Sequence, residues 1–176
     1  MKEIYWVLGE SAAGKETFIK KLASGNLIEL EEKLNIKNKK IVASRESLRL
    51  IGVRLSNQRE RLLEEIPRLL EDNDAVFIKW QSIDTKTNLI NRLNEILPSA
   101  KQIIIKLDVS KKELIKRLPS KPLWRKYGKA GEEEKLVDHD NLKVKQTIKL
   151  LENYKLIIIG SNPEFNYKIL KKMNDY

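Results

Sequence analysis

Residues 4–18 read IYWVLGESAAGKETF: an apolar run, a loop rich in glycine and alanine, and the start of a helical pattern. The stretch from Gly9 to Lys15 has the spacing G-x-x-x-x-G-K. In this spacing the glycines let backbone N–H groups wrap around phosphate oxygens, and the lysine brings a positive charge to the same anion. The helix that follows adds the positive end of its dipole. We therefore predict a phosphate-binding loop over residues 9–17.

The residue after Lys15 departs from the commonest form of this loop. Many such loops have a Ser or Thr there that reaches Mg²⁺, whereas this chain has Glu16, and the hydroxyl comes one residue later, at Thr17. A carboxylate that pointed at a triphosphate would repel it. Because one helical position turns a side chain by about 100°, we favour a Glu16 that points outward. The alternative is that Glu16 meets the phosphates through Mg²⁺ and water.

Short apolar segments rich in β-branched or aromatic residues recur along the chain and predict buried strands. They lie at 3–8, 75–80, 101–107 and 155–160, with a shorter candidate at 39–44. Helical patterns lie between and after them, at 14–24, 56–72, 85–97, 110–118, 139–154 and 162–173. Strands that alternate with helices favour a doubly wound α/β fold around a parallel sheet.

The composition sets limits on function. The chain has 176 residues, about the size of one globular domain. It has no cysteine, which excludes disulfides and cysteine nucleophiles. Its single histidine is His139. No apolar run approaches the roughly 18 residues of a membrane span, and the N-terminus lacks the features of a signal peptide, so we expect a cytoplasmic protein without a membrane partner. The net charge of +10 fits either a lysine-rich surface or a polyanionic ligand.

The loop GESAAGKETF resembles the loops of P-loop kinases related to adenylate kinase, which read G-x-x-G-x-G-K-x-T. In those loops one residue separates the Lys from the Thr, as here, although Ala12 stands where the pattern often has Gly. The resemblance implies a three-layer P-loop NTPase fold with a parallel sheet of about five strands, ATP as phosphoryl donor, and Mg²⁺ held in part by Thr17. It also implies that ATP contacts Gly9, Ser11, Ala12, Ala13, Gly14, Lys15, Glu16 and Thr17, with Lys15 acting in catalysis.

A second informative stretch, IVASRESLRLIGVRL, follows the short strand candidate. Arg45 and Arg49 are four residues apart and would share a helix face, where they could hold phosphate, and Glu46 could accept a proton from an attacking hydroxyl. The stretch resembles the acceptor segment of the polynucleotide 5′-kinase family, in which an acidic base lies between two such arginines. That family uses Asp rather than Glu. Nucleoside monophosphate kinases also place phosphate-binding arginines here without a base, and an Arg/Glu pair on a surface helix is a further alternative.

The strand at 75–80 is where a P-loop protein would have an acid for its metal ion. No acid follows it directly. Asp84 is a weak candidate ligand for Mg²⁺, and Gln81 is a candidate contact for the acceptor. Trp80, at the end of this strand, is expected in the core.

The stretch IIIKLDVSKKELIKRLPSK resembles the approach to the lid in nucleotide and polynucleotide kinases. The segment after it is rich in charge, Pro and Gly, and we expect it to be irregular over 119–140. It would be either a disordered surface loop or, as we favour, a basic lid at about 117–140 that closes over phosphates. Arg117 and Arg125 are its candidate catalytic residues, because cations there would stabilise the transferring phosphoryl group. In adenylate-kinase-like folds the loop after the last parallel strand lies against the adenine, which makes Asn162 a candidate contact for ATP.

Together these features predict a P-loop phosphotransferase with one domain spanning residues 1–176. It would move the γ-phosphate of ATP to a nucleoside, nucleotide or nucleic-acid 5′ acceptor by in-line transfer. A regulatory P-loop NTPase that hydrolyses slowly and binds a protein or nucleic-acid partner is the main alternative. A non-catalytic nucleic-acid-binding module is a third possibility.

Overall fold

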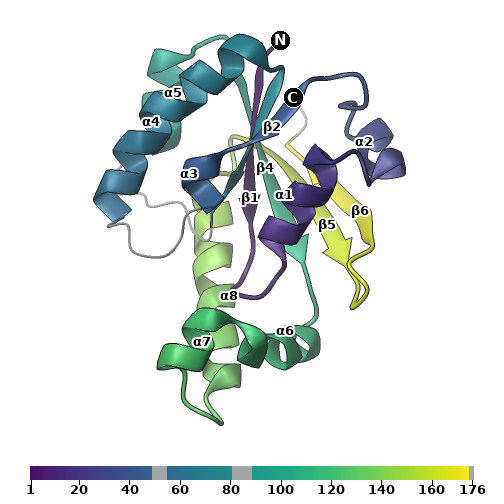
Figure 1. The fold of residues 1–176 in the computed structure, drawn as a ribbon, viewed down its shortest axis with the longest axis vertical. Coiled ribbons are helices and arrows are strands. Elements are labelled where there is room, and N and C mark those ends of the chain that lie inside the picture. Colours follow the sequence, from purple (N-terminus) through teal and green to yellow (C-terminus); the bar gives the residue numbers. More distant parts are fainter. Residues whose placement is uncertain (49–54, 81–88, 175–176) are drawn as a thin grey trace.

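The computed structural model of the chain describes residues 1–48, 55–80 and 89–174, and its centre is a six-stranded sheet with the strand order β2-β3-β1-β4-β5-β6 (Figure 1). The first five of these strands in space are mutually parallel, and β6 pairs with β5 in the antiparallel direction. The chain thus has the predicted α/β fold. The parallel sheet of five strands is as expected, and a sixth strand extends it at one edge.

The strands lie where the apolar segments predict them. They are β1 (Glu3–Leu8), β2 (Ile41–Ala43), β3 (Ala75–Lys79), β4 (Lys101–Asp108) and β5 (Lys155–Ser161). In the centre of the sheet, β1 is buried from Ile4 to Leu8 because helices cover both of its faces.

The sixth strand corrects the helix that we predicted over 162–173. This segment forms β6 (Tyr167–Met173), which a tight hairpin joins to β5. Asn162 makes the turn: its side-chain oxygen accepts hydrogen bonds from the N–H groups of Glu164 and Asn166. The side chains then alternate, since Tyr167 and Ile169 pack on the core while Lys168 and Leu170 are exposed. This period of two is that of an edge strand.

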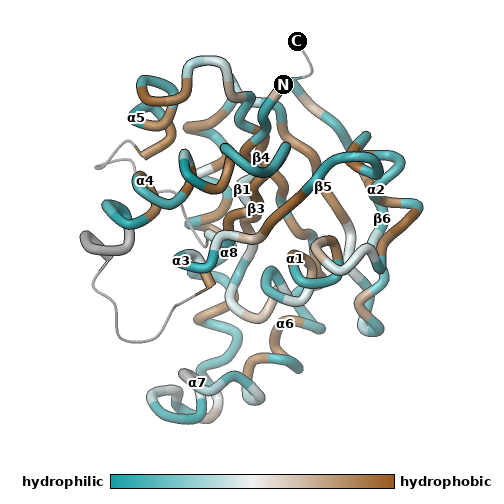
Figure 2. The backbone as a smooth tube through the Cα atoms, turned by 45° about the horizontal axis from the view of Figure 1, so that its top comes forward, coloured by the Kyte–Doolittle hydropathy of each residue, from teal (hydrophilic) through white to brown (hydrophobic). Residues whose placement is uncertain are grey.

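Helices cover the two faces of the sheet with separate hydrophobic cores. On one face α1 (Lys15–Ala23) and α2 (Ile28–Lys33) pack, and on the other α4 (Leu55–Asp72) and α5 (Leu89–Ile96) pack. Figure 2 shows hydrophobic residues concentrated in the central strands, whereas the helices such as α4 and α5 alternate hydrophobic and hydrophilic residues. Within the described ranges, no helix is both long enough and apolar enough to span a bilayer.

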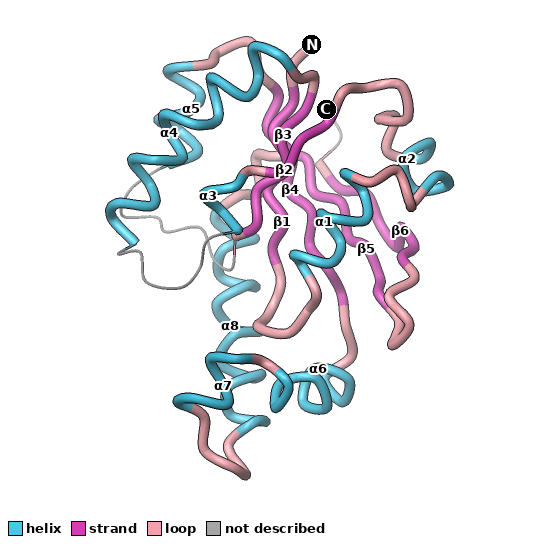
Figure 3. Tube along the Cα trace, in the orientation of Figure 1, coloured by secondary structure: helices cyan, strands magenta, loops and turns pink. Residues whose placement is uncertain are grey.

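The segment expected to be irregular is mostly helical, so this prediction is wrong. It follows α6 (Lys111–Arg117) and contains a 3₁₀ turn η1 (Leu118–Ser120), α7 (Pro122–Tyr127) and the start of α8 (Glu133–Leu150) (Figure 3). Pro122 occupies the first turn of α7, where a missing N–H costs nothing. Pro122 and Gly128 thus mark the start and the end of a short helix and do not prevent helix formation.

Candidate functional site

The predicted phosphate loop connects β1 to α1 at the carboxyl edge of the sheet. Gly14 has φ 85° and Ala12 has φ 70°, so both adopt the left-handed conformation that turns successive N–H groups toward one side. A Cβ added at Gly9 would lie only 2.9 Å from the Cβ of Ala13, which is why this position needs glycine. A left-handed backbone favours glycine, so Ala12 carries a Cβ in a conformation that residues with a Cβ seldom adopt.

Lys15 lies folded against its own loop. Its ammonium donates to the carbonyl oxygens of Gly9 at 2.8 Å and Glu10 at 3.0 Å, and the residue is buried. Burial, together with the nearby Lys79 ammonium, lowers the pKa of Lys15 to about 7, although the carboxylates of Asp140 and Glu10 act in the opposite direction. A phosphate would supply the negative charge that this buried ammonium lacks.

The lowered pKa of Lys15 makes a prediction about stability. The unfolded chain keeps the proton up to the ordinary pKa of 10.5 whereas the folded chain releases it near 7. Between these values the unfolded state binds more protons, so the free energy of unfolding rises with pH. Thermal melts should show that wild-type protein gains stability relative to Lys15→Met from about pH 7 to pH 10, and not below pH 6. Parallel curves for the two proteins across this range would contradict the burial of a titrating Lys15.

The helix α8 holds the other side of the loop. The buried carboxylate of Asp140 accepts a hydrogen bond from the N–H of Ser11 at 3.0 Å, and Asn141 donates to Glu10 at 2.9 Å. Figure 1 shows α8 rising from the lid helices to the loop. The loop and the segment that follows the lid are therefore joined directly, a contact that sequence reasoning missed because it joins residues about 130 positions apart.

Arg117 lies against the predicted phosphate loop. One of its terminal nitrogens is 3.4 Å from the carbonyl oxygen of Ala12, and the other donates to the carbonyl of Asn162 at 3.0 Å. Its guanidinium stacks on the ring of Phe165 at 4.3 Å. The same ring covers Gly14, because a Cβ there would lie 3.0 Å from it. The hairpin between β5 and β6 thus positions Arg117, and the predicted contact residue Asn162 belongs to this hairpin.

Other lid cations differ in their distance from the loop. Lys121 is close enough to Lys15 and Lys79 to disfavour their charged forms, whereas Arg125 is exposed on α7. Trp124 packs partly against the core and lies against Gly128, which closes α7. The structure therefore brings Arg117 to the predicted phosphate loop and leaves Arg125 exposed on α7.

The acceptor segment forms a short helix, α3 (Arg45–Leu48), which Glu65 of α4 anchors. The buried Glu65 carboxylate accepts hydrogen bonds from the Ser44 hydroxyl at 2.6 Å and from the N–H groups of Arg45 at 2.9 Å and Glu46 at 3.3 Å. Glu46 is mostly buried and lies 3.6 Å from Arg61. Arg49, Gln81 and Asp84 fall outside the described residues.

The anchoring role of Glu65 can be tested by its stability effect. Glu65→Ala removes the acceptor of three hydrogen bonds within a buried site, so we expect it to lower the free energy of unfolding by about 2–4 kcal/mol. Glu64→Ala, on the exposed face of the same helix, should change it by less than about 0.5 kcal/mol. Urea unfolding measures both. Equal effects of the two substitutions would show that α3 does not depend on Glu65.

A protein-held Mg²⁺ fits the described residues poorly. The last residue of β3 is Lys79, a cation, where a metal-binding acid would stand, and Glu16 makes ion pairs with Lys20 at 2.7 Å and Lys79 at 3.4 Å. In the part of the chain that the structure describes, no three His, Cys, Asp or Glu residues come together to hold a metal. Thr17, half-buried on α1, remains the one described hydroxyl proposed for this role.

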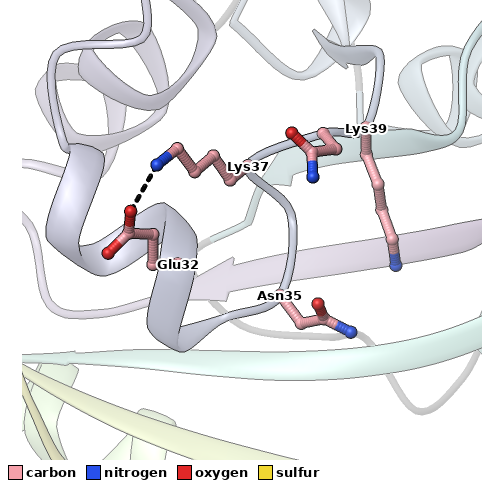
Figure 4. A pocket seen from close by; sticks show the side chains of 5 residues that line it. Glu32, Asn35, Lys37 and Lys39 are labelled. Atoms are coloured by element: carbon pink, nitrogen blue, oxygen red, sulfur yellow. Dashed lines mark hydrogen bonds and ion pairs between the residues drawn. The ribbon is translucent and has the colours of Figure 1, made fainter.

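Two surface hollows lie away from this site. One is lined by Glu32, Asn35, Lys37, Asn38 and Lys39 (Figure 4), and the other by residues that include Lys101 and Lys155. Both lie at the amino ends of strands, opposite the phosphate loop, whereas ligands of open parallel sheets bind at the carboxyl ends. The phosphate loop, under Arg117 and Phe165, is therefore the stronger candidate site.

Comparison with known proteins bears on the fold. No model of a protein family matches the chain, and no curated protein matches it in sequence. Among solved structures, the chain is similar to one of the PezAT chromosomal toxin–antitoxin system of Streptococcus pneumoniae (TM-score 0.53, 11% identity, 100% of this chain and 74% of that one). It is also similar to shikimate kinase from Acinetobacter baumannii in complex with shikimate (TM-score 0.52, 15% identity, 92% and 84% of the two chains). At these identities the likeness shows the fold alone: a mostly parallel α/β sheet with helices on both faces, shared with this shikimate kinase.

Proposed function

We propose that this protein is a P-loop phosphotransferase that moves the γ-phosphoryl group of ATP to a nucleoside, nucleotide or nucleic-acid 5′ acceptor. The acceptor oxygen attacks the γ-phosphorus, its proton passes to Glu46 where the acceptor is a hydroxyl, and ADP leaves. Positioning and electrostatic stabilisation supply most of the catalysis in such transfers. The residues of this chain supply the cations and backbone donors.

The observation that carries the proposal is the meeting of three elements at one edge of the sheet. The loop after β1 has left-handed backbone and leads into the N-terminus of α1. Lys15 lies buried within this loop, and Arg117, at the end of α6, contacts it. Loop amides and a helix N-terminus bind phosphate. A buried lysine and a lid arginine are the groups that would stabilise charge on a transferring phosphoryl group. A loop that served only as a strand-to-helix turn would need neither cation.

The acceptor side is supported by the position of α3. It follows β2, and the hydroxyl of Ser47 accepts a hydrogen bond from the N–H of Lys79 at 3.0 Å, which docks α3 on the end of β3. Arg45 and Glu46 therefore stand at the carboxyl edge, the same edge as the phosphate loop. This arrangement favours a bound acceptor between the loop and α3.

Transfer of radiolabelled γ-phosphate to a panel of acceptors tests the proposal. The panel holds nucleosides, nucleoside monophosphates, 5′-hydroxyl DNA and RNA, and shikimate, which the similar kinase binds, with a reaction lacking acceptor as control. We expect label on one acceptor class at a rate well above ADP release in the control. Failure to label any of them would count against the proposal.

A slow regulatory NTPase is the second candidate, and Lys79 favours it. A cation in place of the strand-end acid is unusual for a fast metal-assisted enzyme. Release of ADP in the reaction without acceptor, with no labelled product on the panel, would support this candidate over the kinase.

A further inference from the structure

Lys79 is placed at the phosphate loop by the register of the sheet. It is the last residue of β3 and pairs with Val7 of β1, two residues before the loop begins at Gly9. The hydroxyl of Ser47 fixes its backbone N–H at 3.0 Å, and only 13% of its side chain is exposed. The ammonium therefore has little freedom to leave the edge of the sheet where the loop lies.

Three positive charges influence one another at this edge of the sheet: those of the buried Lys15, of Lys79 and, more weakly, of the exposed Lys121. The Lys79 ammonium is the largest electrostatic influence, after burial, that lowers the pKa of Lys15, and Lys121 acts on both. On the negative side, Glu16 faces Lys79 at 3.4 Å, while Asp140 and Glu10 face Lys15. Lys79 itself is faced in these contacts by the carboxylate of Glu16, which it shares with Lys20.

A structural ion pair with Glu16 does not account for Lys79. Glu16 already has a closer partner, Lys20, at 2.7 Å on the same helix, and this pair needs no cation from β3. Lys79 is the more deeply buried of the two lysines, and burying an ammonium costs free energy that a half-exposed carboxylate at 3.4 Å offsets only in part. A bound ligand with several negative charges would offset the rest of the free-energy cost of burying the Lys79 ammonium.

We propose that the Lys79 ammonium binds the phosphate chain of the nucleotide, at the strand end where an acid would otherwise hold a metal ion, so that the site binds nucleotide with little need for a divalent cation. The inference rests on the proposed function, since it assumes that the loop holds a nucleotide. It assigns Glu16 a role as well. In the structure described here, Glu16 is the counter-ion of Lys79, and the phosphates replace it when the nucleotide binds.

Calorimetric titration with ATP, in Mg²⁺ and in EDTA, tests the inference. We expect wild-type affinity to change less than about threefold between the two conditions. Lys79→Met should weaken ATP binding about ten- to a hundredfold in EDTA, the loss expected for a charge-assisted contact. Lys20→Met, which removes the other partner of Glu16 at the surface, is the matched control and should change it less than about threefold.

A second variant keeps the test decisive if Lys79→Met folds poorly. Glu16→Gln releases Lys79 and removes a negative charge, so it should strengthen ATP binding in EDTA by about threefold or more. The inference fails if wild-type protein binds ATP in Mg²⁺ but not in EDTA, if Glu16→Gln binds no better, or if a folded Lys79→Met behaves like Lys20→Met. The failure of the proposed function looks different: wild-type protein would then bind no ATP in either condition, or would bind it equally well after Lys15→Met.

Discussion

Lys15→Met is expected to reduce ATP affinity by more than about a hundredfold and to abolish phosphoryl transfer. The side chain is buried among the turns of the loop, with its ammonium 2.8 Å and 3.0 Å from two loop carbonyls, and no other described side chain starts within the loop and carries a positive charge. Methionine keeps most of the length of the side chain and removes its charge. The phosphates would then face loop carbonyls and the carboxylates of Glu10 and Asp140 with no central cation.

Direct binding measurements with ATP and with inorganic triphosphate check this result. Both ligands should lose affinity, because the missing contact is to phosphate. Lys20→Met, on the exposed face of α1, serves as the control and should bind both ligands as wild-type protein does. Tight ATP binding by folded Lys15→Met would remove the loop from the nucleotide site.

The central strands could be predicted from sequence because their patterns are local. The segment Ile4–Leu8 is continuously apolar, and only a strand covered on both faces buries every residue of so short a run. The helical pattern over 110–118 is local as well: it forms α6, whose first turn is capped by the Ser110 hydroxyl, which accepts the N–H of Glu113 at 3.2 Å. Trp80 also lies in the core, edge-on to Trp6.

The edge strand β6 was missed because two periodicities compete in one short segment. FNYKILKKM places apolar residues at spacings that suit a helix as well as a strand, and pairing with β5 decides between them. That pairing is a long-range property of the sheet, invisible to local propensity. The segment 119–140 was wrongly expected to be irregular because local signals were given too much weight. Pro122 and Gly128 are typical helix breakers, but here they stand at the start and the end of α7.

The candidate site residues that belong to sequence motifs could be predicted, whereas those that reach the loop from distant parts of the chain could not. The loop residues and Arg117 follow from motifs, but Lys79, Asp140 and Phe165 reach the loop from β3, α8 and the terminal hairpin. Glu16 illustrates the gap. Its pair with Lys20 is local to α1, whereas its second contact, with Lys79, brings the carboxylate to the edge of the sheet beside the loop and depends on the order of strands.

Glu46→Gln is expected to lower transfer to a hydroxyl acceptor by about 10²–10⁴-fold while leaving ATP affinity unchanged, the loss typical of a general base. The amide keeps the shape of the side chain and cannot accept the proton. Glu46 suits the role because α3 is held rigidly by Glu65, and because Arg61 lies 3.6 Å from its carboxylate. The base would therefore be fixed at the carboxyl edge of the sheet.

Single-turnover rates with the best acceptor of the panel, measured for three variants, decide whether Glu46 is that base. Glu46→Asp keeps the carboxylate and should retain more activity than Glu46→Gln, whereas Glu64→Gln, exposed on α4, should match wild-type protein. An unchanged rate for Glu46→Gln would remove this residue as base and favour an acceptor that is already an ionised phosphate, since such an acceptor has no proton to lose. The Glu46→Gln variant thus distinguishes a kinase that phosphorylates a hydroxyl group from a nucleoside monophosphate kinase, which phosphorylates a phosphate group.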